Sequence, residues 1–330
     1  MGTKIGVIGG GAWGTALANM LAVKGYDTLI WCREPRCAES ISTKHENTDF
    51  LPGYTLASNL RATSEMSDMA GMSAILMVTP AQYMRGTLQA FQPYAADGLP
   101  VVLCSKGIEL GSLCLMTDVL KQELPEVVAG VLTGPSFAKD IVVGLPTAVT
   151  LACEDATVAT HLAELVSSPA FRPYISRDIT GAEVGGAVKN VLAIACGITL
   201  GMGLGRSAHA ALITRGFAEM SRLGMALGAE VTTLTGLCGL GDLVLTCSSE
   251  TSRNMSCGLA LGKGERLEDI MAARSAVTEG VSTAPAIRAL SQKLGITMPI
   301  CEAVADIVEN KIEVHAAFSQ LMNRPLRWEA

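Results

Sequence analysis

Lys189 and Asn190 interrupt a stretch of the chain that is otherwise apolar and has the periodicity of a helix. The stretch reads "GGAVKNVLAIACGI", and a lysine buried in such a helix is costly unless it has a chemical purpose. A lysine on the surface of a helix is the commoner case in general. Apolar residues on both sides of Lys189 favour a functional side chain here, and proton transfer is chemistry that such an amine can supply.

A second group of polar residues lies in "TGLCGLGDLVLTCSSETSRN". Asp242 and Thr246 are four residues apart, so they share one face of the chain if this segment is a helix. A carboxylate at that place can orient a lysine and stabilise its charge. We therefore expect Asp242 to support a catalytic lysine.

Three further polar residues, Ser252, Arg253 and Asn254, follow a few positions later. The planar guanidinium of Arg253 offers paired donors that suit a phosphate, and its two neighbours add hydrogen-bonding groups. Taken alone, the triplet is compatible with an ordinary polar loop. Together with Lys189 it indicates a small phosphorylated substrate.

The N-terminal segment predicts the element that would bring a redox cofactor to these side chains. Residues 5–8 form a short β-branched run, and residues 12–24 have helical periodicity. Between them Gly9, Gly11 and Gly14 fit G-x-G-x-x-G, in which the glycines permit a tight turn, close approach of a pyrophosphate and close packing of helix on strand. Glycine turns are common in a chain with 34 glycines, but the position between strand and helix indicates a dinucleotide.

Short apolar runs alternate with helical stretches up to about residue 178, which predicts βαβ units in a mainly parallel sheet. The expected strands after the first are 27–32, 74–78, 101–104, 127–132 and 147–152. The loops that follow three of them, "TPAQ", "SKGIE" and "TGPSFAKD", should lie near the cofactor. From residue 181 onward only helical periodicity recurs. We predict an α/β fold, with a Rossmann-type dinucleotide-binding domain over 1–180 and an all-helical substrate domain over 181–330.

Composition excludes several classes of protein. The net charge is −6 and no run of Lys or Arg occurs, which argues against nucleic-acid binding. The ten cysteines form no C-x-x-C and the four histidines are scattered, so we expect no metal. The most apolar stretch, 191–205, is shorter than the ~20 residues that span a membrane. We expect a cytoplasmic protein without stable membrane insertion, and a homodimer is a candidate assembly.

Six blocks of the chain resemble, in order, the signature blocks of bacterial NAD(P)-dependent glycerol-3-phosphate dehydrogenases. They are "IGGGAWGTALA", "SKGIE", "TGPSFAKD", "AVKNVLAIACGI", "TGLCGLGDLVLTCSSETSRN" and "VTEGVSTAPA". As a set they are far more specific than the glycine turn. The resemblance implies reversible reduction of dihydroxyacetone phosphate to sn-glycerol 3-phosphate by NADPH or NADH, which supplies the glycerol phosphate backbone for phospholipid synthesis.

The same resemblance implies roles for the catalytic residues. Lys189 corresponds to the general acid and base that protonates the carbonyl oxygen during reduction and removes the hydroxyl proton in reverse. Lys106 corresponds to a lysine between substrate and cofactor. Asp242 and Thr246 correspond to polar groups that support the catalytic lysine, and Asn190 is its neighbour.

Binding residues follow from the resemblance as well, with Arg253 and Asn254 as the clamp for the substrate phosphate. The implied substrate contacts are Lys106, Gly134, Ser136, Lys189, Asp242, Ser252, Arg253 and Asn254. The implied cofactor contacts are Gly9, Gly11, Trp13, Gly14, Arg33, Lys106, Ala138, Arg253, Val277 and Glu279.

Two positions leave details of cofactor binding open. The family frequently has tyrosine before "LP" where this chain has Phe50. Near the end of the second strand, Arg33 can pair with a 2′-phosphate, whereas Glu34 can bind a ribose 2′-hydroxyl. We expect NADPH to be used, without a strict preference over NADH.

Two alternatives compete with this interpretation. A 6-phosphogluconate or 3-hydroxyacyl-CoA dehydrogenase would combine the same kinds of domain, although "SRN" after Asp242 favours a small phosphate. An inactive nucleotide sensor would keep the glycines but lose the proton-transfer residues, and here Lys106, Lys189 and Asp242 are all present.

Overall fold

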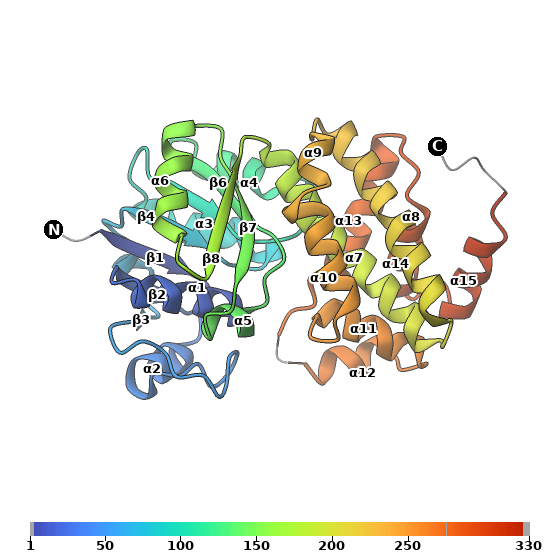
Figure 1. The fold of residues 1–330 in the computed structure, drawn as a ribbon, viewed down its shortest axis with the longest axis horizontal. Coiled ribbons are helices and arrows are strands. Elements are labelled where there is room, and N and C mark those ends of the chain that lie inside the picture. The colour runs from blue at the N-terminus through green and yellow to red at the C-terminus, as the bar shows by residue number, and fades with distance from the viewer. Residues whose placement is uncertain (1–2, 275, 326–330) are drawn as a thin grey trace.

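The computed structural model describes residues 3–274 and 276–325 of the chain. Figure 1 shows a sheet flanked by helices beside a bundle of helices, with the N-terminus in the first part and the C-terminus in the second. We call these parts the sheet domain and the helical domain. The last strand ends at Ser176 and the first long helix begins at Ile179, so the predicted boundary at 180/181 falls in the first turn of that helix.

One eight-stranded sheet forms the centre of the sheet domain, in the order β3-β2-β1-β4-β5-β6-β7-β8. The first six strands in this order are parallel to one another. Strand β7 is antiparallel to β6, and β8 is parallel to β7. In the register of the central strands, Ile5 pairs with Thr28 and with Ala74. The strands are β1 Lys4–Ile8, β2 Asp27–Trp31, β3 Arg61–Thr63, β4 Ala74–Met77, β5 Pro100–Leu103, β6 Val128–Thr133, β7 Thr147–Ala152 and β8 Phe171–Ser176.

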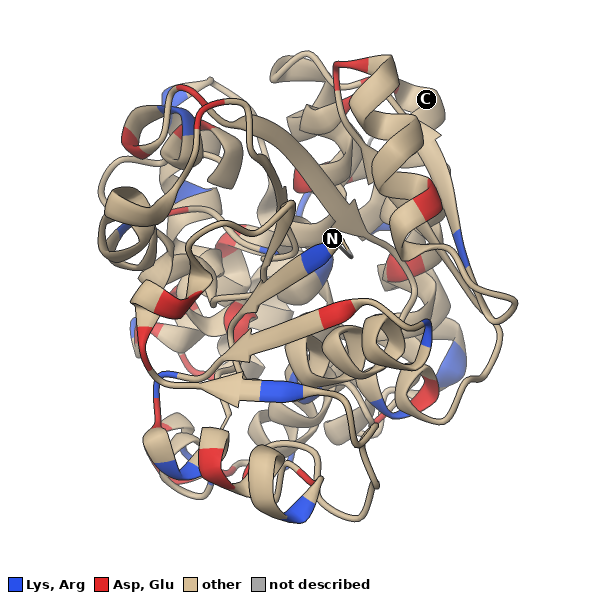
Figure 2. Cartoon of the chain, turned by 90° about the vertical axis from the view of Figure 1, so that its left-hand side faces the viewer, with Lys and Arg blue, Asp and Glu red and all other residues tan. Residues whose placement is uncertain are grey.

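Helices cover both faces of this sheet, which explains why its inner strands are continuous apolar runs. One buried cluster contains side chains of α1, α2, α5 and α6, and the other contains those of α3 and α4. The helices are α1 Ala12–Val23, α2 Pro35–Lys44, α3 Met84–Phe91, α4 Met116–Glu123, α5 Ala138–Val142 and α6 Ala156–Val166, with short 3₁₀ helices η1 Met66–Met69, η2 Ala81–Tyr83 and η3 Gln92–Tyr94. Figure 2, viewed from this domain's side, shows basic and acidic residues interspersed.

The helical domain surrounds one long central helix, α7 (Ile179–Gly201), which Figure 1 shows leaving the sheet domain. Every residue of α7 from Gly181 to Thr199 is buried. The remaining elements are α8 Gly205–Ala226, α9 Val231–Leu234, the π-helix η4 Leu237–Gly241, α10 Asp242–Ser248, α11 Arg253–Gly262, α12 Leu267–Ala272, α13 Glu279–Lys293, α14 Pro299–Val308 and α15 Val314–Met322.

Two stretches of this domain have the length and apolar composition of a membrane span, 179–201 and 231–248. The first is α7, whose apolar surface packs against the other helices of the bundle. The second is divided among α9, η4 and α10 and carries the buried carboxylate of Asp242. Both stretches therefore have a place in the packed helical domain.

Glycines let α7 and α11 pack backbone against backbone. A Cβ atom on Gly258 would lie 2.0 Å from the carbonyl oxygen of Ile194, and one on Gly197 would lie 2.1 Å from that of Met255. Such contacts leave no room for a side chain on either helix. The spacing between the two helices is thus set by main-chain atoms.

The fold class predicted from sequence is confirmed, but the sequence reading missed two strands. All the predicted strands are present within one or two residues. The missed strands, β3 and β8, are the two edges of the sheet. β3 has only three residues, and β8 contains Pro173 and exposes Arg172, Tyr174 and Ile175. Neither strand is therefore the apolar run from which a buried parallel strand is recognised.

Replacing Gly258 by alanine should destabilise the protein, because the new methyl group would clash with a main-chain carbonyl that cannot move aside. We expect a loss of about 3 kcal/mol, the upper part of the usual cost of overpacking. Gly86→Ala is the matched control, since no atom lies within 4 Å of its Cβ position and alanine is the better helix former. Urea unfolding of both variants tests this, and equal midpoints for the two would contradict it.

Candidate active site

The glycine turn lies where the order of the parallel strands reverses, between β1 and β4, which is where open α/β sheets bind ligands. Gly9 has φ +128°, a conformation that L side chains rarely adopt, and a Cβ there would also lie 2.8 Å from the carbonyl of Val78. A Cβ on Gly14 would lie 2.0 Å from the carbonyl oxygen of Gly9. These two glycines are thus required by the turn and by the packing of α1 on β1.

Gly11 differs from its neighbours because nothing lies within 4 Å of its Cβ position. It is the N-cap of α1, so the open space adjoins the unpaired N–H groups of a helix start, which attract phosphate. Within the described residues, Nε1 of Trp13 in α1 is a buried atom without a hydrogen-bond partner, and so is Oε2 of Glu279, which lies beside Gly107 on the loop after β5. The residues present therefore fit a dinucleotide.

At the end of β2, the side chains of Arg33 and Glu34 form an ion pair of 2.5 Å. The guanidinium of Arg33 also lies 5.7 Å from the centre of the Tyr83 ring. The Arg33 side chain is 69% exposed, so it is free to turn toward a ligand. Phe50 lies in the segment after α2, where its N–H donates to Oδ1 of Asn47 at 3.1 Å.

The centre of the site is a buried carboxylate shared by two lysines. Nζ of Lys189 donates to Oδ1 of Asp242 at 2.5 Å, and Nζ of Lys106 donates to Oδ2 of the same residue at 2.7 Å. Lys189 also donates to Oγ1 of Thr246 at 2.9 Å. Asp242 is 1% exposed and Lys189 6%, so the structure brings together the four residues that the sequence placed in proton transfer.

The local fold explains why Asp242 reaches Lys189. Asp242 follows directly on η4, a π-helix whose extra residue per turn re-aims the chain. Gly185 of α7 lets this segment approach, since a Cβ there would lie 2.5 Å from the carbonyl oxygen of Cys238. Thr246 is one turn further along α10, and its hydroxyl is 3.1 Å from Oδ1 of Asp242.

This environment changes the proton affinity of both charged groups. Burial and, to a smaller extent, the positive charge of Lys106 lower the pKa of Lys189 to about 7, although the charge of Asp242 opposes the change. Burial alone would raise the pKa of Asp242, but the charges of Lys106 and Lys189 hold it below its usual value. Lys189 is therefore able to gain and lose a proton near neutral pH while Asp242 stays ionised.

Two asparagines fix the main chain around the lysines. Asn190 donates to the carbonyl oxygen of Lys106 at 3.0 Å and accepts from Nδ2 of Asn254 at 2.9 Å. Oδ1 of Asn254 accepts from the N–H of Gly280 at 2.9 Å. The side-chain amide of Asn254 is thus engaged within the protein, which leaves its backbone N–H as the group available to a ligand.

Arg253 is the first residue of α11 and is exposed to solvent. Within the described residues its guanidinium forms no ion pair. Ser252 caps the helix by accepting from the N–H of Met255 at 3.2 Å, and Arg274 holds the carbonyl oxygen of Arg253 at 2.6 Å. A free guanidinium at a helix start is a suitable site for a phosphate.

The remaining predicted residues lie in two places, between β6 and the start of α5 and before α13. The carbonyl oxygen of Gly134 accepts from Lys106 at 3.3 Å and from the Ser136 hydroxyl at 3.0 Å. Ala138 begins α5 and packs in the core that includes α1. Val277 is 38% exposed and lies in the segment before α13.

Sequence reading missed three supporting residues. Asn47, fully buried, donates to the carbonyl oxygen of Gly10 and to Oγ1 of Thr15, both at 2.8 Å. Glu183 on α7 accepts from the N–H of Thr117 at 2.9 Å and so caps α4. Arg85 binds the loop that follows Lys106. Only Glu183 left a signal, as a carboxylate within an apolar helical stretch.

The chain is similar to one known protein family along most of its length. Residues 4–159 match the model for the NAD-dependent glycerol-3-phosphate dehydrogenase N-terminus, and residues 178–319 match the model for its C-terminus. A glycerol-3-phosphate dehydrogenase [NAD(P)+] of Hyphomonas neptunium is 61% identical over 98% of this chain and 97% of that protein. The corresponding protein of Caulobacter vibrioides is 56% identical over 99% of both chains.

Solved structures agree with these relatives. The crystal structure of glycerol-3-phosphate dehydrogenase from Coxiella burnetii has a TM-score of 0.95 and 37% identity, covering 98% of this chain and 99% of that one. A ketopantoate reductase from Ralstonia eutropha has a TM-score of 0.61 at 16% identity, over 96% of this chain and all of that one. The latter likeness concerns the fold alone.

Asp242→Asn should strongly destabilise the protein, because it removes the charge that compensates two neighbouring lysines. Breaking a buried ion pair from one side costs about 3–5 kcal/mol. The double variant Asp242→Asn/Lys189→Met should recover part of this loss, since it removes the lysine left buried without a counter-charge. Denaturant unfolding of the single and double variants measures the free energy of unfolding. Strictly additive losses of this free energy would contradict an energetic coupling of the two charges.

Proposed function

The chain belongs to the NAD-dependent glycerol-3-phosphate dehydrogenase family, and from this premise we propose that it reduces dihydroxyacetone phosphate to sn-glycerol 3-phosphate with NADPH or NADH, reversibly. The observation that carries the proposal is the buried Lys189, held by Asp242 at 2.5 Å beside a glycine turn suited to a dinucleotide. The product would serve as the backbone for phospholipid synthesis. The family match removes the other dehydrogenases as alternatives.

Lys189 is the proposed general acid. When bound, the reduced nicotinamide supplies a hydride to the carbonyl carbon of the substrate. The carbonyl oxygen then gains a proton from Nζ of Lys189, and the amine is left neutral. Asp242 and Thr246 keep Nζ in place in both protonation states, since the carboxylate accepts from either form of the amine. In the reverse direction the neutral amine removes the hydroxyl proton.

Binding of the substrate phosphate is assigned to Arg253, with the N–H groups at the start of α11. Ser252 caps that helix, and Asn254 adds its backbone N–H while its side chain ties α11 to Asn190. Nζ of Lys106 lies 5.3 Å from the centre of the Trp13 ring, and Lys106 is the proposed lysine between substrate and cofactor. Gly134 and Ser136 complete the proposed substrate contacts from the loop after β6.

The cofactor contacts are proposed along the switch point, from Gly9, Gly11, Gly14, Trp13 and Ala138 to Val277 and Glu279. Burial raises the pKa of Glu279 to about 7, so this side chain can be protonated and donate a hydrogen bond to a neutral ligand. Arg33 and Glu34 offer one group each for a 2′-phosphate and a 2′-hydroxyl, which supports use of both NADPH and NADH. No metal is needed for this chemistry.

We also propose a cytoplasmic location and a homodimer as the assembly to be tested by light scattering. The ten cysteines are all free thiols, which supports a reducing compartment.

Replacing Lys189 and Arg253 separately tests the two roles. Lys189→Met should lower kcat by roughly 10²–10⁴-fold, the range for general acid–base catalysis, with a smaller effect on the KM for dihydroxyacetone phosphate. Arg253→Ala should raise that KM and lower kcat as well, because binding of the remote phosphate also orients the carbonyl. Steady-state oxidation of NADPH and NADH provides the measurement.

The control for both variants is NADPH binding by fluorescence titration. Lys189→Met should keep the affinity of the parent, and Arg253→Ala, which changes an implied cofactor contact, should still bind NADPH. A near-normal kcat for Lys189→Met would move the role of acid to Lys106. Absence of turnover by the parent with dihydroxyacetone phosphate would contradict the proposed function and favour the nucleotide sensor.

The pH dependence should have opposite signs in the two directions. Reduction needs protonated Lys189, so its kcat/KM should fall as pH rises through about 7, the lowered pKa of this amine. Oxidation needs the neutral amine and should rise over the same interval. Rate profiles from pH 5.5 to 9 check this, and Glu279→Gln tests the contribution of Glu279, whose pKa is raised to about 7 at the proposed cofactor site. Loss of the limb in Glu279→Gln would assign it to the glutamate instead.

A further inference from the structure

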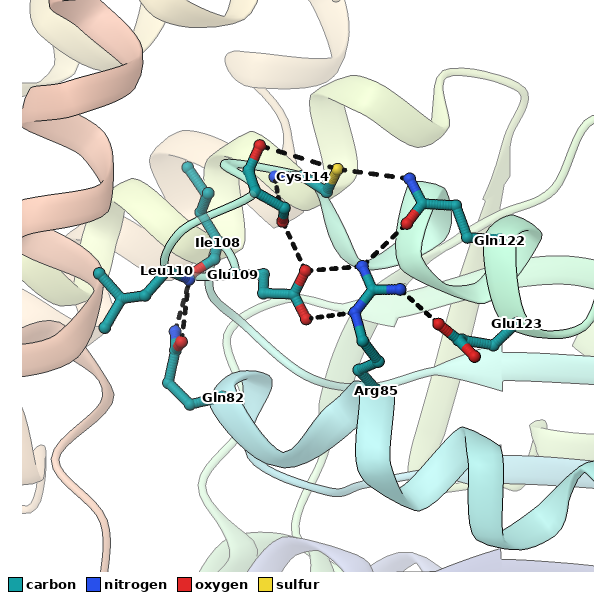
Figure 3. A network of polar contacts seen from close by, with 9 residues as sticks. Gln82, Arg85, Ile108, Glu109, Leu110, Cys114, Gln122 and Glu123 are labelled. Atoms are coloured by element: carbon teal, nitrogen blue, oxygen red, sulfur yellow. Dashed lines mark hydrogen bonds and ion pairs between the residues drawn. The ribbon is translucent and has the colours of Figure 1, made fainter.

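Arg85 joins three segments of the sheet domain through one guanidinium (Figure 3). Its Nε and Nη2 donate to the two carboxylate oxygens of Glu109 at 2.9 and 2.7 Å. Nη2 also donates to Oε1 of Gln122 at 2.8 Å, and Nη1 donates to Glu123. Arg85 belongs to the first turn of α3, Glu109 to the loop after β5, and the other two to the last turn of α4.

Residues 107–115 form the loop that we call the β5–α4 loop, and Glu109 makes hydrogen bonds to several of its other residues. Its N–H donates to the carbonyl oxygen of Cys114 at 3.0 Å, and its own carbonyl accepts from the N–H of Leu113 at 3.0 Å. Its carboxylate also accepts from the Ser112 hydroxyl at 2.5 Å. The hydrogen bonds from Arg85 keep the pKa of Glu109 below its usual value, so the clamp stays charged.

Gln82 binds the main chain of the same loop on either side of Glu109, as Figure 3 shows. Its Nε2 donates to the carbonyl oxygen of Ile108 at 2.8 Å, and its Oε1 accepts from the N–H of Leu110 at 3.0 Å. Gly107 packs so closely that a Cβ there would lie 2.7 Å from that of Ala81. The residues between Lys106 and Glu109 are therefore held against η2 and α3.

The β5–α4 loop connects the active site to the core of the helical domain. Lys106 immediately precedes it, and Ile108 and Leu115 are buried in the core of the helical domain. Glu109 is the third residue after Lys106, so the main chain between them spans at most about 11 Å. The side chains that fix the loop thus act within a short distance of the lysine that shares Asp242 with Lys189.

We propose that Arg85 is a positioning residue for the reaction: by fixing Glu109 it holds the β5–α4 loop, and with it Lys106, at Asp242. This inference rests on the proposed function, in which Lys106 lies between substrate and cofactor. Arg85 itself touches neither the substrate contacts nor the glycine turn. Its effect on turnover is exerted through Glu109.

Arg85→Met keeps most of the side-chain length and removes every hydrogen bond of the guanidinium. It should lower kcat by about tenfold to a hundredfold, the loss that a displacement of about 1 Å can cause at an active site. NADPH affinity should change less than kcat, because the glycine turn is untouched and Lys106 is only one of the implied cofactor contacts. Arg85→Lys, which keeps the charge but cannot bind a carboxylate with two parallel bonds, should be intermediate.

The pH profile provides a readout that mere loss of stability would not give. The charged groups facing Lys189 are Asp242 and Lys106, and displacement of Lys106 removes repulsion of the protonated amine. The pKa of Lys189 should therefore rise, and the alkaline limb for ketone reduction should move to higher pH in Arg85→Met. Glu109→Gln should shift the limb in the same direction, and the double variant should add little to either single one.

Arg288→Met is the matched control. Arg288 is also partly buried, with 16% of its side chain exposed, and pairs with two carboxylates, Asp306 and Glu309. Loss of this cluster on the helical domain should leave the pH profile unchanged. Hydrogen exchange of peptides covering 107–115 should accelerate in Arg85→Met and stay at the parent rate in Arg288→Met.

An unchanged kcat in Arg85→Met would overturn the inference, and so would a lower kcat with unchanged loop exchange and an unshifted alkaline limb. Loop exchange and an NMR titration of the Lys189 amine do not depend on turnover. If the parent fails to reduce dihydroxyacetone phosphate, the proposed function fails, whereas these two measurements still decide whether Arg85 holds the loop and Lys106 in place.

Discussion

One carboxylate shared by two lysines from different domains sets the requirements for the rest of the structure. Asp242 and Lys189 come from the helical domain, and Lys106 comes from the sheet domain, so the charges meet only when both domains are assembled. With all three groups ionised the cluster carries a net positive charge in a buried place. Burial of Lys189, with a smaller contribution from the charge of Lys106, lowers the pKa of this amine to about 7. A lysine that releases its proton near neutral pH is suited to proton transfer to a ketone.

The contacts between the domains serve the same cluster. Glu183 caps α4 from α7, Asn190 holds the main chain of Lys106, and Ile108 enters the core of the helical domain. Each of these contacts lies within two turns of Lys189 along α7 or within a few residues of Lys106. The surface that joins the domains is therefore largely the surface that builds the site, and a change in one alters the other.

Much of this could be predicted from sequence because it is local. Strand, glycine turn and helix follow from residues 4–24, and Lys189 with Asp242 and Thr246 follows from polar groups at helical spacing in apolar segments. The edge strands β3 and β8 were not predicted, because short or exposed strands lack an apolar run. Arg85, Gln82 and Asn47 escaped because their partners are main-chain atoms and side chains far along the chain, and no local pattern records such pairing. The free guanidinium of Arg253 was expected, but the engagement of the Asn254 amide was not.

The glycine contacts between α7 and α11 bear on which molecules the enzyme can accept. Lys189 belongs to one of these helices and Arg253 begins the other. Because main-chain atoms set the distance between the helices, exchanging side chains in the core cannot easily move the proposed proton donor relative to the proposed phosphate-binding group. If both residues have the proposed roles, the fixed distance between them favours substrates with one particular number of carbons between the carbonyl and the phosphate. Substrate length would then be selected by the packing of the main chain of α7 on that of α11, and not by the side chains that line the site.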